Sequence, residues 1–211
     1  MAGHRGQAEI MPITRPQIEE LEQALANTPC SKHSSILSRV TDLFLHGAAN
    51  YSHDHVVIFD HVIGFLIEKI DYEALVELSG RLMDVDNAPP NVVGRLARHE
   101  DIDISGPLLE RSNVLTDKDL VEIVMTTKAQ NHLARIASRT ELSEAVADAL
   151  ADRGNSDTVL KLIHNERAHL SELGFAKVIN RAGSDKAIAT AVSSRKDLPA
   201  ELQPFLKLAL E

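Results

Sequence analysis

Four arginines recur at a constant interval of about 28 residues, and much of the sequence around them recurs with the same period. They are Arg111, Arg139, Arg167 and Arg195. A fixed internal period of this length is typical of stacked helical repeats, in which each unit packs only against its neighbours. The period therefore predicts an array of repeats, which proteins commonly use as a surface for holding another molecule.

Each repeat contains the signals of two short helices. Ser156-Asp157 and Ser184-Asp185 precede apolar runs, and a Ser or Asp in that place can accept a hydrogen bond from an unpaired backbone N–H at a helix start. Thr116, Ser143 and Ser171 are the corresponding N-cap candidates of the second helix. The expected helices cover 116–126, 129–138, 143–152, 156–165, 171–181, 184–193 and 199–210.

A leucine follows the polar turn of each repeat. Leu142, Leu170 and Leu198 are each the large apolar residue in a polar stretch, so we expect them to be buried and to anchor the turns.

The helices expected before residue 89 are longer and do not share the period. Residues 1–14 have no periodicity and predict a flexible segment. Residues 15–88 predict a helical bundle that caps the first repeat, with helices starting at Pro16 and covering 34–49, 52–70 and 71–83, the last capped by Asp71. The proline pair Pro89-Pro90 marks the boundary, and 89–211 form the repeats. The predicted fold is all-α: an N-terminal helical bundle that continues into a HEAT-like α-solenoid of short two-helix repeats.

Composition excludes several classes of protein. The formal net charge of −9 argues against sequence-independent nucleic-acid binding, which needs cations to neutralise phosphates. The single cysteine, Cys30, cannot form a disulfide within the chain, which favours a reducing cytoplasmic location. The longest apolar stretch, Val56 to Ile70, contains charged residues and is too short to span a bilayer.

Several segments resemble a known family. Pro89-Pro90-Asn91-Val92-Val93-Gly94-Arg95-Leu96-Ala97, Asp101-Ile102-Asp103-Ile104-Ser105-Gly106-Pro107-Leu108-Leu109-Glu110-Arg111-Ser112 and Leu142-Ser143-Glu144-Ala145-Val146 resemble the bacterial domain of unknown function 2336, found mainly in alphaproteobacteria. Val40 to Leu45 is similar to its N-terminal half. The resemblance implies an all-helical, HEAT-like cytoplasmic protein, and it implies no activity, since the family has no catalytic residues to carry over.

The richest polar cluster lies between His46 and His61. Its candidate metal ligands are His53, Asp54, Asp60 and His61, which could serve a metal-dependent hydrolase. Helical metal pairs need ligands at i and i+4, and Val57 occupies the position that would pair with both His53 and His61. The spacing therefore favours polar groups at a helix start over a metal site.

A second acidic group, Asp101, Asp103 and Glu110, could bind a cation or act as acid and base. Asp101 directly precedes an apolar run, so helix capping is the simpler interpretation.

The leading functional hypothesis is a non-enzymatic module for protein interaction or regulation, without a cofactor. The arginine ladder has two interpretations: cations at helix C-termini, or a positive stripe that binds a partner. The alternatives are a sensor that binds an anionic small molecule, such as a nucleotide second messenger, on the ladder, or the hydrolase at His46–His61. The sequence leaves open the partner, the process, the oligomeric state and whether the native chain continues past Glu211.

Overall fold

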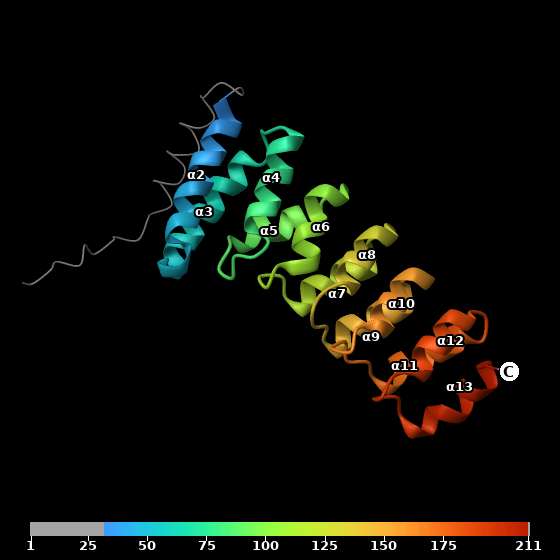
Figure 1. Cartoon of the computed structure of the whole chain (residues 1–211). Coiled ribbons are helices and arrows are strands. Elements are labelled where there is room, and N and C mark those ends of the chain that lie inside the picture. The colour runs from blue at the N-terminus through green and yellow to red at the C-terminus, as the bar shows by residue number, and fades with distance from the viewer. Residues whose placement is uncertain (1–31, 211) are drawn as a thin grey trace, which may run out of the picture. The chain divides into compact units, whose positions relative to one another are not determined.

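The computed structural model describes residues 32–210, whose regular elements are helices apart from one isolated β-bridge (Figure 1). This confirms the all-α prediction. Cys30, the segment 1–14 and the helix expected from Pro16 lie outside the described residues. The chain divides into two compact units, Met1–Ala74 and Leu75–Glu211.

Unit 1 is built on two packed helices, α2 (His33–Gly47) and α3 (His53–Leu66), joined by the 3-10 turn η2 (Ala48–Asn50). Their facing residues form an apolar core in which Phe44 and Ile63 are fully buried. The Phe44 ring meets the Phe59 ring edge-on, with 5.1 Å between centroids, and this geometry is a favourable one for aromatic pairs. The helices predicted at 34–49 and 52–70 are therefore present, the second ending a few residues early.

Polar side chains fix the helix starts of unit 1. Ser52 and His55 form a capping box at the start of α3. Asp71 Oδ1 accepts from the Ala74 amide at 3.0 Å, and Asp71 Oδ2 accepts from the Ser34 hydroxyl at 3.1 Å. Asp71 thus begins α4 (Tyr72–Leu82), as predicted, and α4 contains the division between the two units.

Unit 2 continues with nine α-helices among the described residues, each eight to eleven residues long. They are α5 (Pro90–Ala97), α6 (Ile102–Arg111), α7 (Asp117–Thr126), α8 (Gln130–Ala137), α9 (Glu144–Arg153), α10 (Ser156–His164), α11 (Glu172–Ala182), α12 (Lys186–Ser193) and α13 (Gln203–Leu210). The 3-10 turn η3 (Ala200–Leu202) precedes α13. For α7 to α11, each end lies within one residue of the predicted one. The segment predicted as one helix at 199–210 is instead η3 followed by α13.

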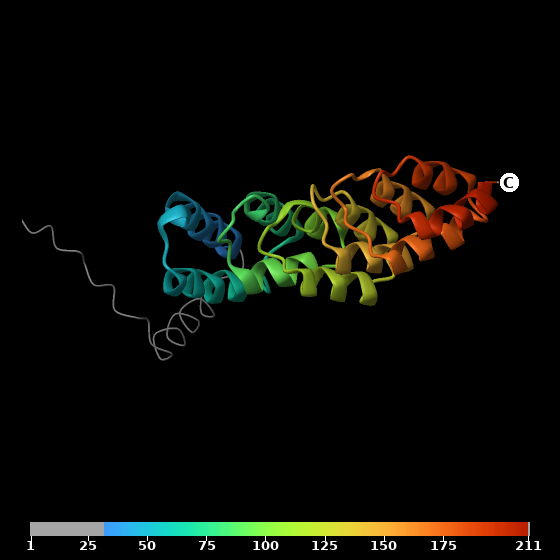
Figure 2. The ribbon, with the colours of Figure 1, turned by 90° about the horizontal axis from the view of Figure 1, so that it is seen from below.

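The helices from α6 onward pack in two rows. The first row holds α6, α8, α10 and α12, each against the next, and the second holds α7, α9, α11 and α13 (Figure 1). Figure 2 shows these helices following one another in chain order along the array. Alternate helices thus stack on their counterparts one period away, as stacked repeats require. The HEAT-like classification and the domain limits 15–88 and 89–211 stay predictions.

Most of the predicted caps are present. Thr116, Ser171 and Asp185 each accept a backbone amide at the start of their helix. Two details differ from the predictions: α10 is capped by Asn155 rather than Ser156, and the Ser143 side chain caps nothing. The Ser143 hydroxyl is buried and has no hydrogen-bond partner among the described residues.

The leucine prediction is right for one member and wrong for two. Leu142 is 2% exposed, whereas Leu170 and Leu198 are half-buried. In the loop after α10, the buried residue is Ala168 rather than Leu170. Ala168 pairs with Leu142 in the β-bridge. In this bridge the Leu142 amide donates to Arg167 O, and the His169 amide donates to Leu142 O. Leu198 has no later loop of the array to cover it within the described residues. Burial at the turns therefore follows the bridge rather than the period.

Gly174 is required where α11 begins against α9. A Cβ on Gly174 would lie 2.0 Å from Asp148 Oδ1, and the Asp148 carboxylate accepts from both the amide and the hydroxyl of Ser171. We expect Gly174→Ala to displace Asp148 and to lower the free energy of unfolding by about 1–3 kcal/mol in urea titrations. Gly80→Ala is the control: its Cβ meets nothing within 4 Å, so we expect a gain of roughly 0.5–1 kcal/mol from helix propensity. Equal effects would contradict the steric argument.

Candidate binding surface

The four periodic arginines lie at one edge of the array, where first-row helices connect to second-row helices. Arg111 is the last residue of α6, and Arg139, Arg167 and Arg195 follow α8, α10 and α12. The structure gives these four side chains different environments, although they occupy similar places in the sequence period.

Arg195 is the most completely held of the four. Its side chain is 5% exposed, and its guanidinium donates to the carbonyl oxygens of Ile163 (3.2 Å), Asn165 (2.8 Å) and Ala168 (2.8 Å) at the end of α10. It also donates twice to the carboxylate of Asp197, and these hydrogen bonds lower the pKa of Asp197. A planar guanidinium can donate to the three carbonyl oxygens and to the carboxylate at once, because its five N–H groups point outward in one plane.

Arg139 repeats this arrangement two periods earlier in the array. Its guanidinium donates to the carbonyl oxygens of Leu109 (2.9 Å) and Ser112 (2.8 Å), which lie at the end of α6. Burial lowers the pKa of the Arg139 guanidinium from its ordinary value. The cation thus satisfies helix-end carbonyls that would otherwise lack donors.

Arg111 and Arg167 are exposed, and their environments differ. The Arg111 guanidinium donates in bidentate fashion to Asp84, with N–O distances of 2.8 and 2.9 Å. Within residues 32–210 the Arg167 guanidinium has no hydrogen-bond or ion-pair partner. In the loop after α8, the carbonyl oxygen of Arg139 accepts a hydrogen bond from Asn165 Nδ2 at 2.7 Å.

These contacts favour the structural interpretation of the ladder, with one correction. The sequence predicts that each arginine donates to the last carbonyls of the helix it follows. Arg139 and Arg195 instead donate to carbonyls at the end of the preceding first-row helix. The reason is the stacking, which brings the end of that earlier helix within reach of the long arginine side chain. Partner binding by the four arginines stays a hypothesis.

A polar cavity of about 580 Å³ lies at this edge. Its walls combine acids, amides and hydroxyls with two of the ladder arginines: Asp84, Glu110, Arg111, Asn113, Ser138, Arg139, Thr140 and Glu141. We call it the arginine-edge groove. Arg111 is paired with Asp84 and Glu110 with Arg135 at 2.8 Å, whereas Glu141 is exposed and forms no ion pair with another described residue. The groove therefore presents hydrogen-bonding groups and one uncompensated carboxylate.

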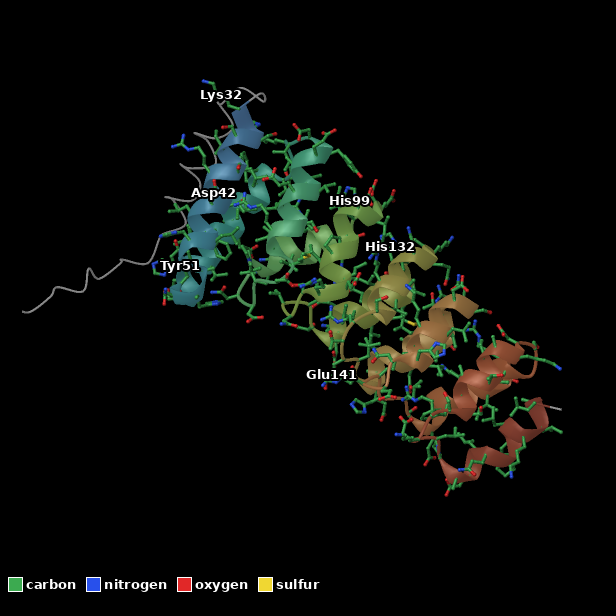
Figure 3. All side chains as sticks on the ribbon, in the orientation of Figure 1. Lys32, Asp42, Tyr51, His99, His132 and Glu141 are labelled. Atoms are coloured by element: carbon green, nitrogen blue, oxygen red, sulfur yellow. The ribbon has the colours of Figure 1, made fainter. Side chains whose placement is uncertain are left out.

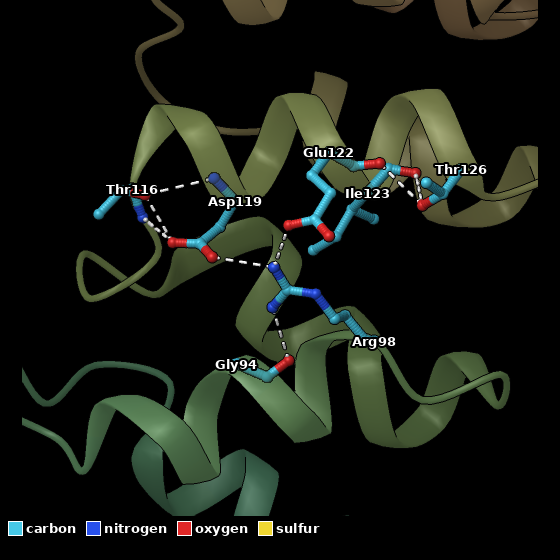
Figure 4. Close-up of polar contacts among 7 residues, drawn as sticks. All are labelled: Gly94, Arg98, Thr116, Asp119, Glu122, Ile123 and Thr126. Atoms are coloured by element: carbon cyan, nitrogen blue, oxygen red, sulfur yellow. Dashed lines mark hydrogen bonds and ion pairs between the residues drawn. The ribbon is translucent and has the colours of Figure 1, made fainter.

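At the opposite edge, Arg98, which follows α5, connects α5 to α7 through hydrogen bonds and ion pairs. Figure 4 shows its guanidinium between Asp119 (2.9 Å) and Glu122 (2.8 Å) of α7, with a third hydrogen bond to Gly94 O at 3.0 Å. Asp119 also accepts from the hydroxyl and the amide of Thr116, so it serves at once as a cap and as an ion-pair partner. The pKa of Asp119 is lowered, most strongly by the hydrogen bond from the Thr116 side chain and next by the hydrogen bond from Arg98.

This lowered pKa predicts a dependence of stability on pH. A carboxyl whose folded pKa is lower than its unfolded value of about 3.9 stabilises the fold above that value and loses the effect as pH falls through the folded pKa. We expect Asp119→Asn to lower the free energy of unfolding by roughly 1 kcal/mol at about pH 7 and to have less effect at about pH 3. Urea titrations at both pH values measure this, and an effect that does not shrink in acid would contradict it.

A buried histidine joins two first-row helices near the same edge. His132 Nε2 lies 3.0 Å from His99 O and 3.0 Å from Ser105 Oγ, and His132 Nδ1 lies 3.0 Å from Asn131 Oδ1. Ser105 is fully buried and its hydroxyl donates to Asp101 O, so the Ser105–His132 contact serves packing rather than nucleophilic attack. Figure 3 shows His99 and His132 at the edge opposite Glu141.

The remaining sequence candidates do not converge. No group of three or more His, Cys, Asp or Glu side chains within residues 32–210 is placed to hold a metal ion. Of the four candidates, His53, Asp54 and His61 are exposed and Asp60 is buried. Asp101 accepts the Asp103 amide at 2.9 Å as the N-cap of α6, which confirms the capping prediction.

Residues 104–205 match the model of a bacterial family described as uncharacterised and conserved in bacteria, DUF2336. The matched segment runs from α6 into α13, just under half of the chain, and it supports the family that the sequence resembles. No curated protein and no solved structure matches the chain. In the part of the chain that the structure describes, every helix is too short or too polar to cross a bilayer.

Sequence reasoning missed most of the arginine-edge groove. Asp84, Asn113 and Glu141 belong to loops without a motif, and only the stacking brings them beside Arg111 and Arg139. Their common signal is positional, since each lies in a loop that follows a first-row helix or α4. A search of the period for all loop residues, rather than for the invariant arginine alone, would have grouped two of the three.

Proposed function

We propose that the chain is a non-enzymatic binding module, which holds a protein partner at the arginine-edge groove. The observation that carries the proposal is the groove itself, a polar cavity of about 580 Å³ on a two-row helical array. Helical arrays commonly present their loop edges and row surfaces to partners.

The charges of the groove define the partner's chemistry. The basic side chains that line it are engaged, Arg111 by Asp84 and Arg139 by carbonyl oxygens, whereas the Glu141 carboxylate and the Thr140 hydroxyl are exposed. This pattern favours a partner that offers a cation and hydrogen-bond donors, such as a Lys or Arg side chain, over a phosphate group.

The alternative is a sensor for an anionic small molecule on the arginine ladder. An anion would have to displace Asp84 from Arg111 or the carbonyls of Leu109 and Ser112 from Arg139. Of the four ladder arginines, only Arg167 has a guanidinium without a hydrogen-bond or ion-pair partner among the described residues. A thermal-shift series with nucleotides tests this alternative, because a ligand that binds the native state raises the melting temperature.

Affinity capture from the native cell, followed by binding of the purified partner, tests the main proposal. Glu141→Arg should weaken binding at least about tenfold, because it reverses the uncompensated charge of the groove. Glu100→Arg is the matched control, an identical change at an exposed residue next in sequence to His99, which Figure 3 shows at the opposite edge. Equal loss in both variants, or retention of binding by Glu141→Arg, would contradict the groove as the site, and the absence of any partner would contradict the module.

A further inference from the structure

The last helix of the array exposes large apolar side chains. Phe205 and Leu208 on α13 are 62% and 71% exposed, whereas Leu206 between them is buried against the array. Both side chains line an apolar cavity of about 430 Å³, which α11 lines with Ile179 and Asn180 among others. Exposed apolar groups next to an apolar hollow mark an interaction surface. We call this surface the α13 face.

The exposed positions of α13 are more apolar than the equivalent positions of the preceding repeat. One period of about 28 residues earlier, the equivalents of Phe205 and Leu208 are Lys177 and Asn180. In that earlier repeat Lys177 Nζ pairs with Asp152 Oδ1 of α9 at 2.9 Å, which closes the surface between α9 and α11 with an ion pair. The same pair of positions between α11 and α13 is Asn180 and Phe205, and both line the cavity. Between α9 and α11 these two positions form an ion pair, whereas between α11 and α13 they line an open apolar hollow.

We propose that the α13 face binds a second copy of this chain, with the two α13 helices antiparallel about a two-fold axis. Two features of the face make it self-complementary, as a two-fold interface must be. The first is shape, since one face carries both a projecting aromatic ring, Phe205, and a hollow of matching apolar chemistry. The ring of each copy then enters the hollow of the other.

The second feature is charge. The segment Ala200–Leu210 contains two charged residues, Glu201 at its start and Lys207 toward its end. Both are exposed, and within residues 32–210 neither forms an ion pair. An antiparallel arrangement places Glu201 of each copy near Lys207 of the other, so both pairs form at the rim of the apolar contact. Opposite charges at a rim fix the register of such an interface.

Sedimentation velocity of the chain 1–211 over a concentration series tests this proposal. The wild type should sediment as a dimer, and Phe205→Lys with Leu208→Asn, which restores the residues of the earlier repeat, should weaken dimerisation at least about tenfold. Both positions are exposed, so circular dichroism should show unchanged helicity. Leu173→Asn is the control, since Leu173 is 65% exposed on α11 outside the cavity, and it should leave the dimer intact.

Charge exchange tests the orientation. Glu201→Lys should weaken the dimer, and Glu201→Lys combined with Lys207→Glu should restore it, because the pairs re-form with reversed sign. A wild type that stays monomeric at about 100 μM, a concentration far above the Kd of a specific interface, would overturn the proposal. So would a dimer that Phe205→Lys leaves unchanged, or a double charge variant that dimerises no better than Glu201→Lys.

Discussion

Arg195→Ala is expected to lower the free energy of unfolding by about 3–5 kcal/mol, because it leaves three part-buried carbonyl oxygens without these donors. It also removes the cation that pairs with Asp197 and lies over the Phe175 ring, with 5.7 Å between Arg195 Cζ and the ring centroid. Thermal or urea unfolding followed by circular dichroism measures the loss. Arg195→Lys should recover only part of it, since an ammonium cannot supply the planar fan of donors.

The chain provides a matched control for this prediction. Arg167 occupies the same place in the sequence period, but its side chain is exposed and has no hydrogen-bond partner among the described residues. Arg167→Ala should therefore change the free energy of unfolding by less than about 0.5 kcal/mol. Similar losses in the two variants would show that the period, and not the observed contacts, sets the role of these arginines.

Leu142→Ala is expected to cost about 2–5 kcal/mol, because its side chain is fully enclosed at the β-bridge between two loops of the array. Removal of the side chain leaves a cavity in the core, at a residue whose bridge partner Ala168 is itself fully buried. Leu170→Ala is the comparison at the equivalent sequence position. Its half-buried side chain should cost roughly 1–2 kcal/mol, since solvent already reaches part of the site.

Urea titration of both leucine variants checks this ordering. The m-value should stay the same in both, which would show that the loss lies in the native packing and not in the extent of unfolding. A loss from Leu170→Ala as large as that from Leu142→Ala would mean that the loop after α10 packs as the sequence period predicts.

The sequence predicts the helices well because their signals are local. Thr116, Ser171 and Asp185 cap helices through hydrogen bonds to amides two or three residues away, so their effect can be deduced from neighbouring residues alone. The same reasoning identified Asp71 and Asp101. It fails for Ser143, whose hydroxyl has the right position but makes no cap bond.

The site and the turns are harder to predict because they depend on contacts across the repeats. Leu142 and Leu170 share a sequence position, yet the β-bridge buries the first with Ala168 and leaves the second half-exposed. Likewise Arg139 and Arg167 share a position, but the Arg139 guanidinium donates to Leu109 O and Ser112 O, whereas the Arg167 side chain is exposed and has no hydrogen-bond partner among the described residues. A sequence period states which residues are equivalent, and it does not state which contacts each of them makes in the fold.

The arginine contacts have a direction that matters during synthesis. Arg139 and Arg195 donate to carbonyls of the preceding first-row helix, and Arg181 likewise donates to Ala151 O, at the end of α9. A ribosome releases the acceptors before it releases the donors. Each newly made helix pair therefore arrives with the cation that completes the pair made before it, so the array can be consolidated in the order in which it is translated.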